Sequence, residues 1–385
     1  MKIAILTSGR FHVCDLAREL DRLGHEVSFY SCVPKHRTRA FGLPDHCARS
    51  LFWLLAPLYG LMLKCQNTRF RHVAETMLME ALDNLAARVI GPCDVFIGMS
   101  GMSTRTAAAV RRKYGARIWI ERGSRHILSQ QEILMSIPGG NPNPVSGPTV
   151  RRELAEYQMA DTIVVPSRHA EVSFLERGFS PEKVFRNPFG VDLTMFPPTQ
   201  RPANRQRVLV FIGSWSMQKG CDVLWEACRS ANSWRLLHIG AINDAPVPDS
   251  PLFEHREPLP QWRLVDMFRE SDVFVIASRQ EGLSLVQAQA LACGLPVVCT
   301  DRTGGADLRA MLDDPRWVEV ATHGDPVALG RAIEKALALA ATQTGVRDIL
   351  GPARDRFSWK AYGERYSTEL GARAGGRLAP GERRP

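Results

Sequence analysis

Short apolar runs alternate with longer amphipathic segments along most of the 385 residues. Two of these runs, Lys2–Gly9 and Arg207–Gly213, end in a glycine. Each is followed by a helical segment and then by a second apolar run, at Glu26–Tyr30 and Trp234–Gly240 respectively. Apolar runs separated by helices are typical of parallel sheets built from βαβ units. The pattern therefore predicts two doubly wound α/β domains in tandem.

The remaining elements fit the same alternation. Further strands are predicted at Asp94–Ile97, Arg117–Ile120, Thr162–Val165, Asp272–Ala277 and Val297–Cys299, and helices at Val13–Leu23, from Cys221 onward and at Leu283–Cys293. The segment 187–204, NPFGVDLTMFPPTQRPAN, is dense in Pro and Gly, so we expect a linker there. The expected parts are a first domain (1–186), the linker (187–204), a second domain (205–357), a C-terminal helix crossing back to the first domain (358–372) and a disordered basic tail (373–385).

The segment Glu281–Gly305, EGLSLVQAQALACGLPVVCTDRTGG, predicts a loop, a buried helix and a strand in quick succession. The loop follows a predicted strand, and open α/β sheets bind ligands at the carboxyl ends of their strands. A helix that begins there points unpaired N–H groups at the ligand, which suits phosphate. No G-x-G-x-x-G follows either first strand and no G-x-x-x-x-G-K-[ST] is present, which disfavours dinucleotide binding and the usual nucleotide-hydrolysing loop.

The formal net charge of +9 is concentrated in two places, Lys35–Arg71 and the tail Gly371–Pro385. No RNA- or DNA-binding signature accompanies it, so we expect no nucleic-acid partner. Nine cysteines show no C-x-x-C pair and no zinc-like spacing, which predicts free thiols in a reducing cytosol. The first apolar run is too short for a secretory signal, and we therefore expect a cytoplasmic protein.

A second apolar run, Leu51–Leu63, lies within the basic segment. Its 13 residues fall short of the about 20 that span a bilayer. One interpretation is a core helix or helix pair, broken at Pro57 and Gly60. The alternative is a segment that lies at the inner face of the membrane, with its aromatic residues at headgroup depth and with basic residues between 35 and 72 on anionic lipid.

Several of these motifs together resemble the retaining glycosyltransferases of family 4, the glycosyl transferases group 1. EGLSLVQAQ at Glu281–Gln289 resembles their E-x7-E region, and GSWSMQKG at Gly213–Gly220 and NPFGVD at Asn187–Asp192 occur in the family's order. The resemblance covers most of the chain and is strongest over 185–308. It implies the GT-B fold, in which two tandem Rossmann-like domains face each other across a cleft.

The resemblance implies a donor site on the second domain for a UDP-, GDP- or ADP-sugar. Lys219 matches the basic residue that neutralises the leaving diphosphate, and Glu281 matches the glutamate that contacts the donor sugar. Backbone N–H groups at the start of the helix would hold phosphate oxygens. The implied donor-binding residues are Gly213, Ser214, Lys219, Glu281, Gly282, Leu283, Ser284, Leu285 and Gln289.

Two positions depart from the family pattern. The second glutamate of E-x7-E, which holds the nucleotide ribose in the family, is Gln289 here, and an amide binds a diol without the strength of a charged acceptor. The arginine that follows the glycine of the strand turn is replaced by Ser214. One phosphate contact is therefore missing, and the positive charge at the leaving group comes from Lys219 alone or from a cation elsewhere in the protein.

In the first half, ERGSRH at Glu121–His126 follows a predicted strand, where family members place a histidine near the reacting sugar. By this resemblance His126 would hydrogen-bond the donor sugar as a third catalytic residue, beside Glu281 and Lys219. Arg122 would add positive charge on the acceptor side. Gly9, on the same side, would let the first loop approach the acceptor or the diphosphate; the alternative is a simple tight turn.

The implied reaction is transfer of a hexosyl unit from a nucleoside diphosphate sugar to an acceptor hydroxyl with retention of configuration. The basic apolar segment favours a glycan or lipid-linked acceptor in the assembly of a cell-surface polysaccharide or glycolipid. We expect no cofactor and no metal, since no D-x-D ends a predicted strand. Two alternatives stay open: a non-hydrolysing nucleotide-sugar epimerase and a non-catalytic nucleotide-sugar-binding protein.

Overall fold

The computed structural model describes residues 1–65, 70–138, 144–200 and 207–374. The chain divides into two compact units, which are described separately. Unit 1 contains residues 1–119 and the chain from 359 onward, and unit 2 contains residues 120–358. The predicted tail (373–385) lies almost wholly outside the described residues, as do positions 201–204 of the predicted linker. The predicted domain bounds stay a prediction.

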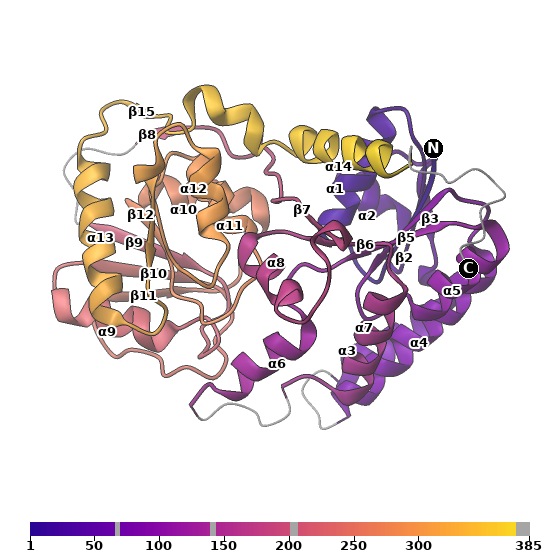
Figure 1. Cartoon of the computed structure of the whole chain (residues 1–385). Coiled ribbons are helices and arrows are strands. Elements are labelled where there is room, and N and C mark those ends of the chain that lie inside the picture. Colours follow the sequence, from indigo (N-terminus) through magenta and orange to yellow (C-terminus); the bar gives the residue numbers. More distant parts are fainter. Residues whose placement is uncertain (66–69, 139–143, 201–206, 375–385) are drawn as a thin grey trace. The chain divides into compact units, whose positions relative to one another are not determined.

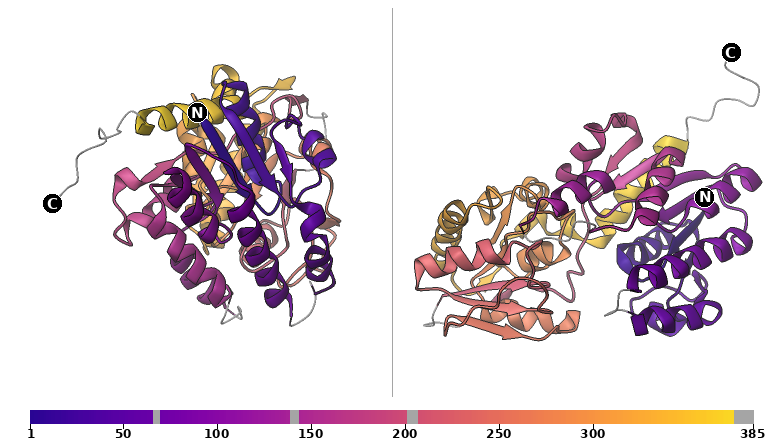
Figure 2. Two further views of the ribbon diagram at one scale, coloured as in Figure 1. Left: turned by 90° about the vertical axis from the view of Figure 1, so that its right-hand side faces the viewer. Right: turned by 90° about the horizontal axis from the view of Figure 1, so that it is seen from below.

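Unit 1 opens with a parallel sheet in which β1 (Lys2–Thr7) pairs with β2 (Glu26–Ser31) and with β4 (Val95–Met99). A short strand, β3 (Ala48–Ser50), extends the sheet beyond β2. The indigo strands of this sheet lie side by side in the left view of Figure 2. Strands β1, β2 and β4 are found where the apolar runs predict them.

Helices cover this sheet. The helix α1 (Phe11–Arg22) connects β1 to β2 and buries one face, including Val13, Leu16 and Leu20. The C-terminal helix α14 (Trp359–Ala374) belongs to unit 1 and packs against α1, as Figure 1 shows. The other helices of unit 1 are α2 (Lys35–Arg39), α3 (Phe52–Cys65), α4 (Arg71–Val89) and α5 (Thr104–Tyr114).

The apolar run at 51–63 forms a single helix, α3, that packs on α4. Two expectations about it are wrong. The helix continues through Pro57 and Gly60, because a proline removes one hydrogen bond without necessarily ending a helix. It is also not a core helix, since Leu55 is its one buried side chain and Trp53 is 81% exposed. No helix in the described part of the chain is long and apolar enough to cross a bilayer.

The strand β5 (Arg117–Glu121) contributes its first three residues to unit 1 and its last two to unit 2. Two further strands follow in unit 2, β6 (Thr162–Val165) and β7 (Val184–Arg186), which pair in parallel. The helices between and beside them are α6 (Ile127–Met135), α7 (Gly147–Met159), α8 (Arg168–Leu175) and the short 3-10 helix η1 (Pro181–Lys183).

A second parallel sheet forms the rest of unit 2, with strand order β11-β10-β9-β12-β13-β14. Its strands are β9 (Val208–Ile212), β10 (Arg235–Ile239), β11 (Phe253–Arg256), β12 (Val273–Ile276), β13 (Val297–Thr300) and β14 (Val318–Ala321). The first strand of this sheet along the chain is β9. Strands β10 and β11 are added on one side of it, and β12, β13 and β14 on the other. The point between β9 and β12 is therefore a topological switch point, where such sheets bind ligands.

Helices cover both faces of this sheet. The helices α9 (Cys221–Ala231) and α13 (Pro326–Ala341) pack together on one face, and α11 (Leu285–Ala292) and α12 (Gly305–Met311) lie on the other (Figure 1). Strands β12 and β13 are buried along their whole length, which explains their uninterrupted apolar sequence. The remaining elements of unit 2 are α10 (Leu264–Glu270), the strand pair β8 (Thr199–Gln200) and β15 (Val346–Arg347), and the 3-10 helices η2 (Gln261–Arg263), η3 (Pro315–Trp317) and η4 (Gly351–Phe357).

Candidate functional site

The candidate site lies on two loops that follow neighbouring strands of the second sheet. The loop after β9 leads through Gly213 and Ser214 to Gly220, and the loop after β12 leads through Glu281 to α11. Gly220 has a φ of +66° and precedes α9; a Cβ there would lie 2.1 Å from the carbonyl oxygen of Ala277. The two loops therefore touch through their backbones, and only glycine fits at this position.

Arg279 fixes the two loops to each other. Its guanidinium donates two hydrogen bonds of 2.6 Å to the carboxylate of Asp222, in the first turn of α9. Its backbone N–H donates to the carbonyl oxygen of Gln218 at 2.9 Å. Burial alone would raise the pKa of Asp222, but the bonds from Arg279 hold this pKa below its ordinary value. A bidentate pair of this kind is a strong and directional contact.

Lys219 and Glu281 meet at this junction and form an ion pair between Nζ and Oε2. Both side chains are half-buried. The backbone N–H of Glu281 donates to the carbonyl oxygen of Arg302, in the loop after β13, at 2.9 Å. The structure therefore places the two charged residues predicted for the donor site in direct contact, on loops of adjacent strands.

The helix α11 begins beside this ion pair. Its N-cap, Ser284, is extended and makes no side-chain capping bond. The first N–H groups of any α-helix have no partner within the helix, so those of α11 are available to an anion. Leu283 is buried, whereas Ser284 and Leu285 are half-buried.

Gly282 sits in the tightest contact of the site. A Cβ at Gly282 would lie 1.9 Å from the carbonyl oxygen of Gly123, and a Cβ at Gly304 would lie 2.5 Å from the carbonyl oxygen of Gly282. The hydroxyl of Ser167, the N-cap of α8, donates to the same carbonyl of Gly282 at 2.7 Å. Nearby, Gln280 Nε2 donates to Ser124 Oγ at 2.5 Å. The loop that carries Glu281 is thus held by backbone on two sides.

Gln289 lies in the second half of α11 and is 5% exposed. Its side-chain oxygen, Oε1, is buried and has no hydrogen-bond partner among the described residues. A buried acceptor without a donor is unfavourable by about 1–3 kcal/mol. A ligand hydroxyl would relieve this cost.

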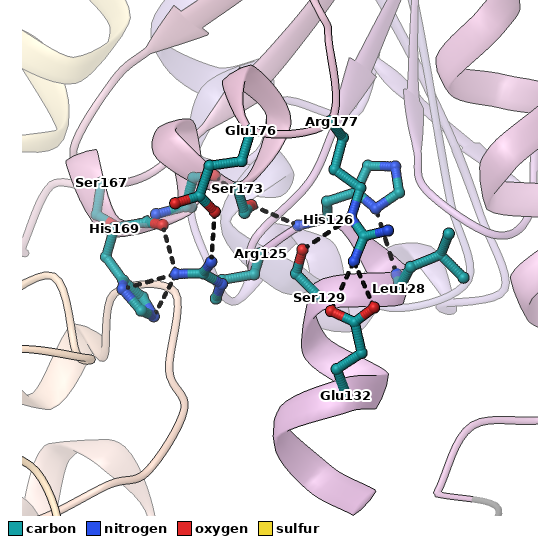
Figure 3. Close-up of polar contacts among 11 residues, drawn as sticks. Arg125, His126, Leu128, Ser129, Glu132, Ser167, His169, Ser173, Glu176 and Arg177 are labelled. Atoms are coloured by element: carbon teal, nitrogen blue, oxygen red, sulfur yellow. Dashed lines mark hydrogen bonds and ion pairs between the residues drawn. The ribbon is translucent and has the colours of Figure 1, made fainter. Parts of the chain in front are cut away.

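His126 is 2% exposed, and Figure 3 shows its polar contacts with Leu128 and Ser173. It is the N-cap of α6: its Nδ1 accepts a hydrogen bond of 3.3 Å from the N–H of Leu128. Its ring packs against Tyr157, Phe174 and Phe179, at centroid distances of 5.0, 5.1 and 5.8 Å. Burial lowers the pKa of His126 to about 4, and the cations Arg177 and Arg122 act in the same direction. These contacts give His126 a structural role, and its contact with a sugar stays a prediction.

Arg122 is half-buried and is also bonded within the protein. Its Nε donates to the carbonyl oxygen of Arg125 at 2.9 Å, and its NH1 lies 3.3 Å from Glu153 Oε1. Gly9 belongs to unit 1, where it follows β1 and its N–H donates to Thr7 Oγ1 at 3.3 Å. The acceptor-side roles of Gly9 and Arg122 stay predictions.

Sequence reasoning missed the residues that hold the loops in place. Arg279, Ser167 and Asp307 contact residues far away in the chain; for example, Asp307 accepts hydrogen bonds of 2.9 and 3.1 Å from the N–H of Arg168. Nothing in the local pattern distinguishes them from ordinary polar residues. Arg279 carried one possible signal, its position two residues before Glu281.

The chain is similar in sequence and in fold to known glycosyltransferases. Residues 206–338 match the family described as Glycosyl transferases group 1. The chain is 30% identical over 266 residues to a D-inositol 3-phosphate glycosyltransferase of Xylanimonas cellulosilytica, an alignment that covers 61% of this chain and 62% of that protein. The chain thus spans less than two thirds of the length of this relative.

Two solved structures show the same fold. Sucrose-phosphate synthase from Thermosynechococcus elongatus has a TM-score of 0.66 at 16% identity, covering 98% of this chain and 100% of that chain. Anabaena HepE in complex with UDP-glucose has a TM-score of 0.61 at 14% identity, covering 97% and 100%. The chain has the GT-B fold, with two Rossmann-like parallel-sheet domains, and its residues 206–338 are similar to the glycosyl transferases group 1. The resemblance and the fold class predicted from sequence are confirmed.

Proposed function

We propose that the protein is a retaining glycosyltransferase that moves a hexosyl unit from a nucleoside diphosphate sugar to an acceptor hydroxyl. The observation that carries the proposal is the Lys219–Glu281 ion pair beside the first turn of α11, within the segment of the group 1 family. The relative from Xylanimonas is named a glycosyltransferase, and the HepE structure contains UDP-glucose, which supports a nucleotide-sugar donor.

The described geometry supports a role for each donor residue. The Lys219 ammonium and the N–H groups of Leu283, Ser284 and Leu285 would bind the diphosphate, because both present positive charge at the same junction. The Glu281 carboxylate would accept hydrogen bonds from sugar hydroxyls. The ion pair holds both charges in place before the donor binds, and it opens as each charge takes a donor group.

Gln289 would accept a hydrogen bond from a ribose hydroxyl through its unpaired Oε1. An amide in this place still satisfies a diol, although it contributes less than a carboxylate. Ser214 adds no positive charge, so Lys219 is the basic side chain that we assign to the leaving diphosphate.

In the proposed reaction, the acceptor oxygen bonds to the anomeric carbon on the face from which the diphosphate departs. The bond between that carbon and the phosphate oxygen breaks, and the acceptor proton leaves on the diphosphate. Glu281, released from Lys219 when the donor binds, accepts hydrogen bonds from sugar hydroxyls and is assigned to binding rather than to attack. The protein then contributes positioning and charge stabilisation, and this scheme requires no metal.

A specific observation favours an acceptor at a membrane. The helix α3 exposes Trp53 and Leu54, and Phe70, the N-cap of α4, and Val73, in its first turn, are also exposed. Exposed apolar side chains in a basic segment suit the surface of an anionic bilayer. We therefore assign the protein to the cytoplasmic face of a membrane, acting on a glycan or lipid-linked acceptor in cell-surface polysaccharide or glycolipid assembly. Trp53→Ala with Leu54→Ala should reduce cosedimentation with phosphatidylglycerol vesicles, and phosphatidylcholine vesicles serve as the control.

Thermal unfolding in the presence of UDP, GDP, ADP and their sugars tests the donor site. One diphosphate should raise the unfolding temperature with concentration, because a ligand that binds only the folded state stabilises it. The shift should be lost in Lys219→Ala and in Glu281→Ala. Lys335→Ala is the matched control, since Lys335 lies exposed on α13.

Turnover of the donor that binds separates the remaining alternatives. A product with retained anomeric configuration supports the proposal. Incorporation of labelled solvent hydrogen into the sugar would instead identify an epimerase, and tight binding without turnover on any acceptor would identify a binding protein.

A further inference from the structure

A polar cavity of about 870 Å³ lies within unit 2 and contains none of the predicted donor residues. It is bounded by α6 and α8 and by the loops that follow β13 and β14. Figure 3 shows the part formed by α6 and α8. Three arginines, Arg125, Arg177 and Arg302, line it together with two histidines, His169 and His323.

Three carboxylates also line the cavity, but they are more exposed than their partners. Arg125 is 13% exposed and lies 3.3 Å from Glu176, which is 61% exposed. Arg177 is 28% exposed and lies 2.6 Å from Glu132, which is 67% exposed. Solvent screens exposed charges far more than buried ones. The less accessible part of the cavity therefore has a positive potential, and the carboxylates lie toward solvent.

Part of this positive charge is not neutralised. The guanidinium of Arg302 forms no ion pair and no hydrogen bond with any residue that the structure describes, and its only side-chain contact of this kind is the bond from its backbone N–H to Thr300 Oγ1 at 3.4 Å. The Nε of Arg125 is buried and likewise without a partner in the described chain. Burial lowers the pKa of Arg125, and Arg302 and Arg177 lower it further against the effect of Glu176. Burial, with Arg125 and Arg302, also lowers the pKa of His169 to about 4. Arg125 is therefore repelled by the two other arginines, whereas His169 is neutral at physiological pH.

The cavity is connected to the proposed donor site through the backbone. The carbonyl oxygen of Arg302 accepts the hydrogen bond from the N–H of Glu281. In addition, Ser167, which caps the cavity helix α8, donates to Gly282. A ligand in the cavity would therefore lie next to the loop that carries the proposed sugar-binding carboxylate.

We infer that this cavity binds the accepting sugar of the proposed glycan or lipid-linked acceptor, and that this sugar carries one phosphate or carboxylate group, as a phosphosugar or a uronic acid does. Arg302 and Arg125 receive the anionic group, and the carboxylates of Glu132, Glu176 and Asp301 accept hydrogen bonds from its hydroxyls. This inference rests on the proposed function and specifies its acceptor. One acceptor hydroxyl supplies the oxygen that replaces the diphosphate at the anomeric carbon, and its proton leaves on the diphosphate.

Calorimetric titration of the full chain, saturated with the nucleoside diphosphate that stabilises it, tests the inference. The probes are glucose 6-phosphate, glucuronate, glucose and inorganic phosphate. At least one of the two anionic sugars should bind about tenfold or more tightly than glucose and than inorganic phosphate. Arg302→Gln should weaken that binding about tenfold or more, because it removes an unpaired charge without disturbing an existing ion pair.

Arg229→Gln is the matched control, since Arg229 is exposed on α9 and pairs with Glu226. It should leave the binding of the anionic sugar unchanged. In turnover assays with the anionic sugar that binds, Arg302→Gln should raise the KM for this acceptor about tenfold and leave the KM for the donor within about a factor of two.

Three results would overturn the inference: neither anionic sugar binds, glucose or phosphate alone binds equally well, or Arg302→Gln has no more effect than Arg229→Gln. Thermal unfolding with the nucleoside diphosphates tests the donor site separately. If no nucleoside diphosphate stabilises the wild-type protein, the proposed function itself fails, whatever binds in the cavity.

Discussion

Replacing His126 with Asn should remove a defined part of the acid sensitivity of this protein. The imidazole is buried among aromatic rings, and its Nδ1 caps α6. Asparagine is also a good N-cap residue, so the variant keeps an acceptor for the N–H of Leu128 and loses only the titratable ring and its packing.

The magnitude follows from the lowered pKa of His126. Its ordinary value of 6.5 applies to the unfolded chain, and the folded value is about 4. As the pH falls below 6.5, the unfolded chain therefore takes up the proton first, and stability that is fully present at neutral pH is lost progressively until about pH 4. At about 1.4 kcal/mol per pH unit, this residue alone should cost about 2 kcal/mol of unfolding free energy between about pH 7 and pH 5.

Urea denaturation of the wild type and of His126→Asn at both pH values measures the effect. The variant is less stable at pH 7 because it loses aromatic packing. The difference in unfolding free energy between the two proteins should shrink by about 2 kcal/mol at pH 5, since all other titrating groups are common to both. A difference that stays constant within about 0.5 kcal/mol would show that the buried ring does not resist protonation, and the reasoning would be wrong.

Three further changes test the loops. Gly282→Ala places a methyl group 1.9 Å from the carbonyl oxygen of Gly123, so the affinity for the nucleoside diphosphate should fall about tenfold in thermal-shift titrations; unchanged affinity would show that the loop yields freely. Arg279→Lys loses the bidentate bond to Asp222 and should lower the unfolding free energy, measured in urea, by about 1–3 kcal/mol. Equal stability of the variant and the wild type would show that Arg279 does not hold the two loops together. Gln289→Glu should tighten nucleoside diphosphate binding about fivefold while destabilising the free protein, and weaker binding in calorimetry would contradict the ribose contact.

The sheets could be predicted closely from sequence. The strand β12 was predicted at Asp272–Ala277 and is found at Val273–Ile276, because a strand buried on both faces requires an uninterrupted apolar run. The loop, helix and strand after it were predicted for a similar reason: Gly294 and Pro296 mark where α11 must end. The contact between Lys219 and Glu281 agrees with both residues being assigned to one site, although their sequence separation alone does not determine it.

Exposure and long-range polar contacts could not be predicted. The composition of α3 is that of a buried helix, and only the tertiary structure shows that Trp53 lies in solvent. Arg125 and Arg302 are far apart in the chain, and no periodicity relates them. His126 was selected by resemblance, but a single sequence does not show that its ring is surrounded by aromatic side chains. These properties depend on which elements pack together, and local patterns do not encode that.

The contact between Gly123, Gly282 and Gly304 has a consequence for how the site can vary. Three stretches of backbone meet there, and none of the three glycines brings a side chain whose rotamer has to be ordered when the loop takes up its position. The spacing is fixed by the van der Waals radii of main-chain atoms, and no substitution can adjust it gradually. Changes in specificity at this site must therefore come from the residues around the glycines. The glycines themselves keep the loops at a constant distance from one another.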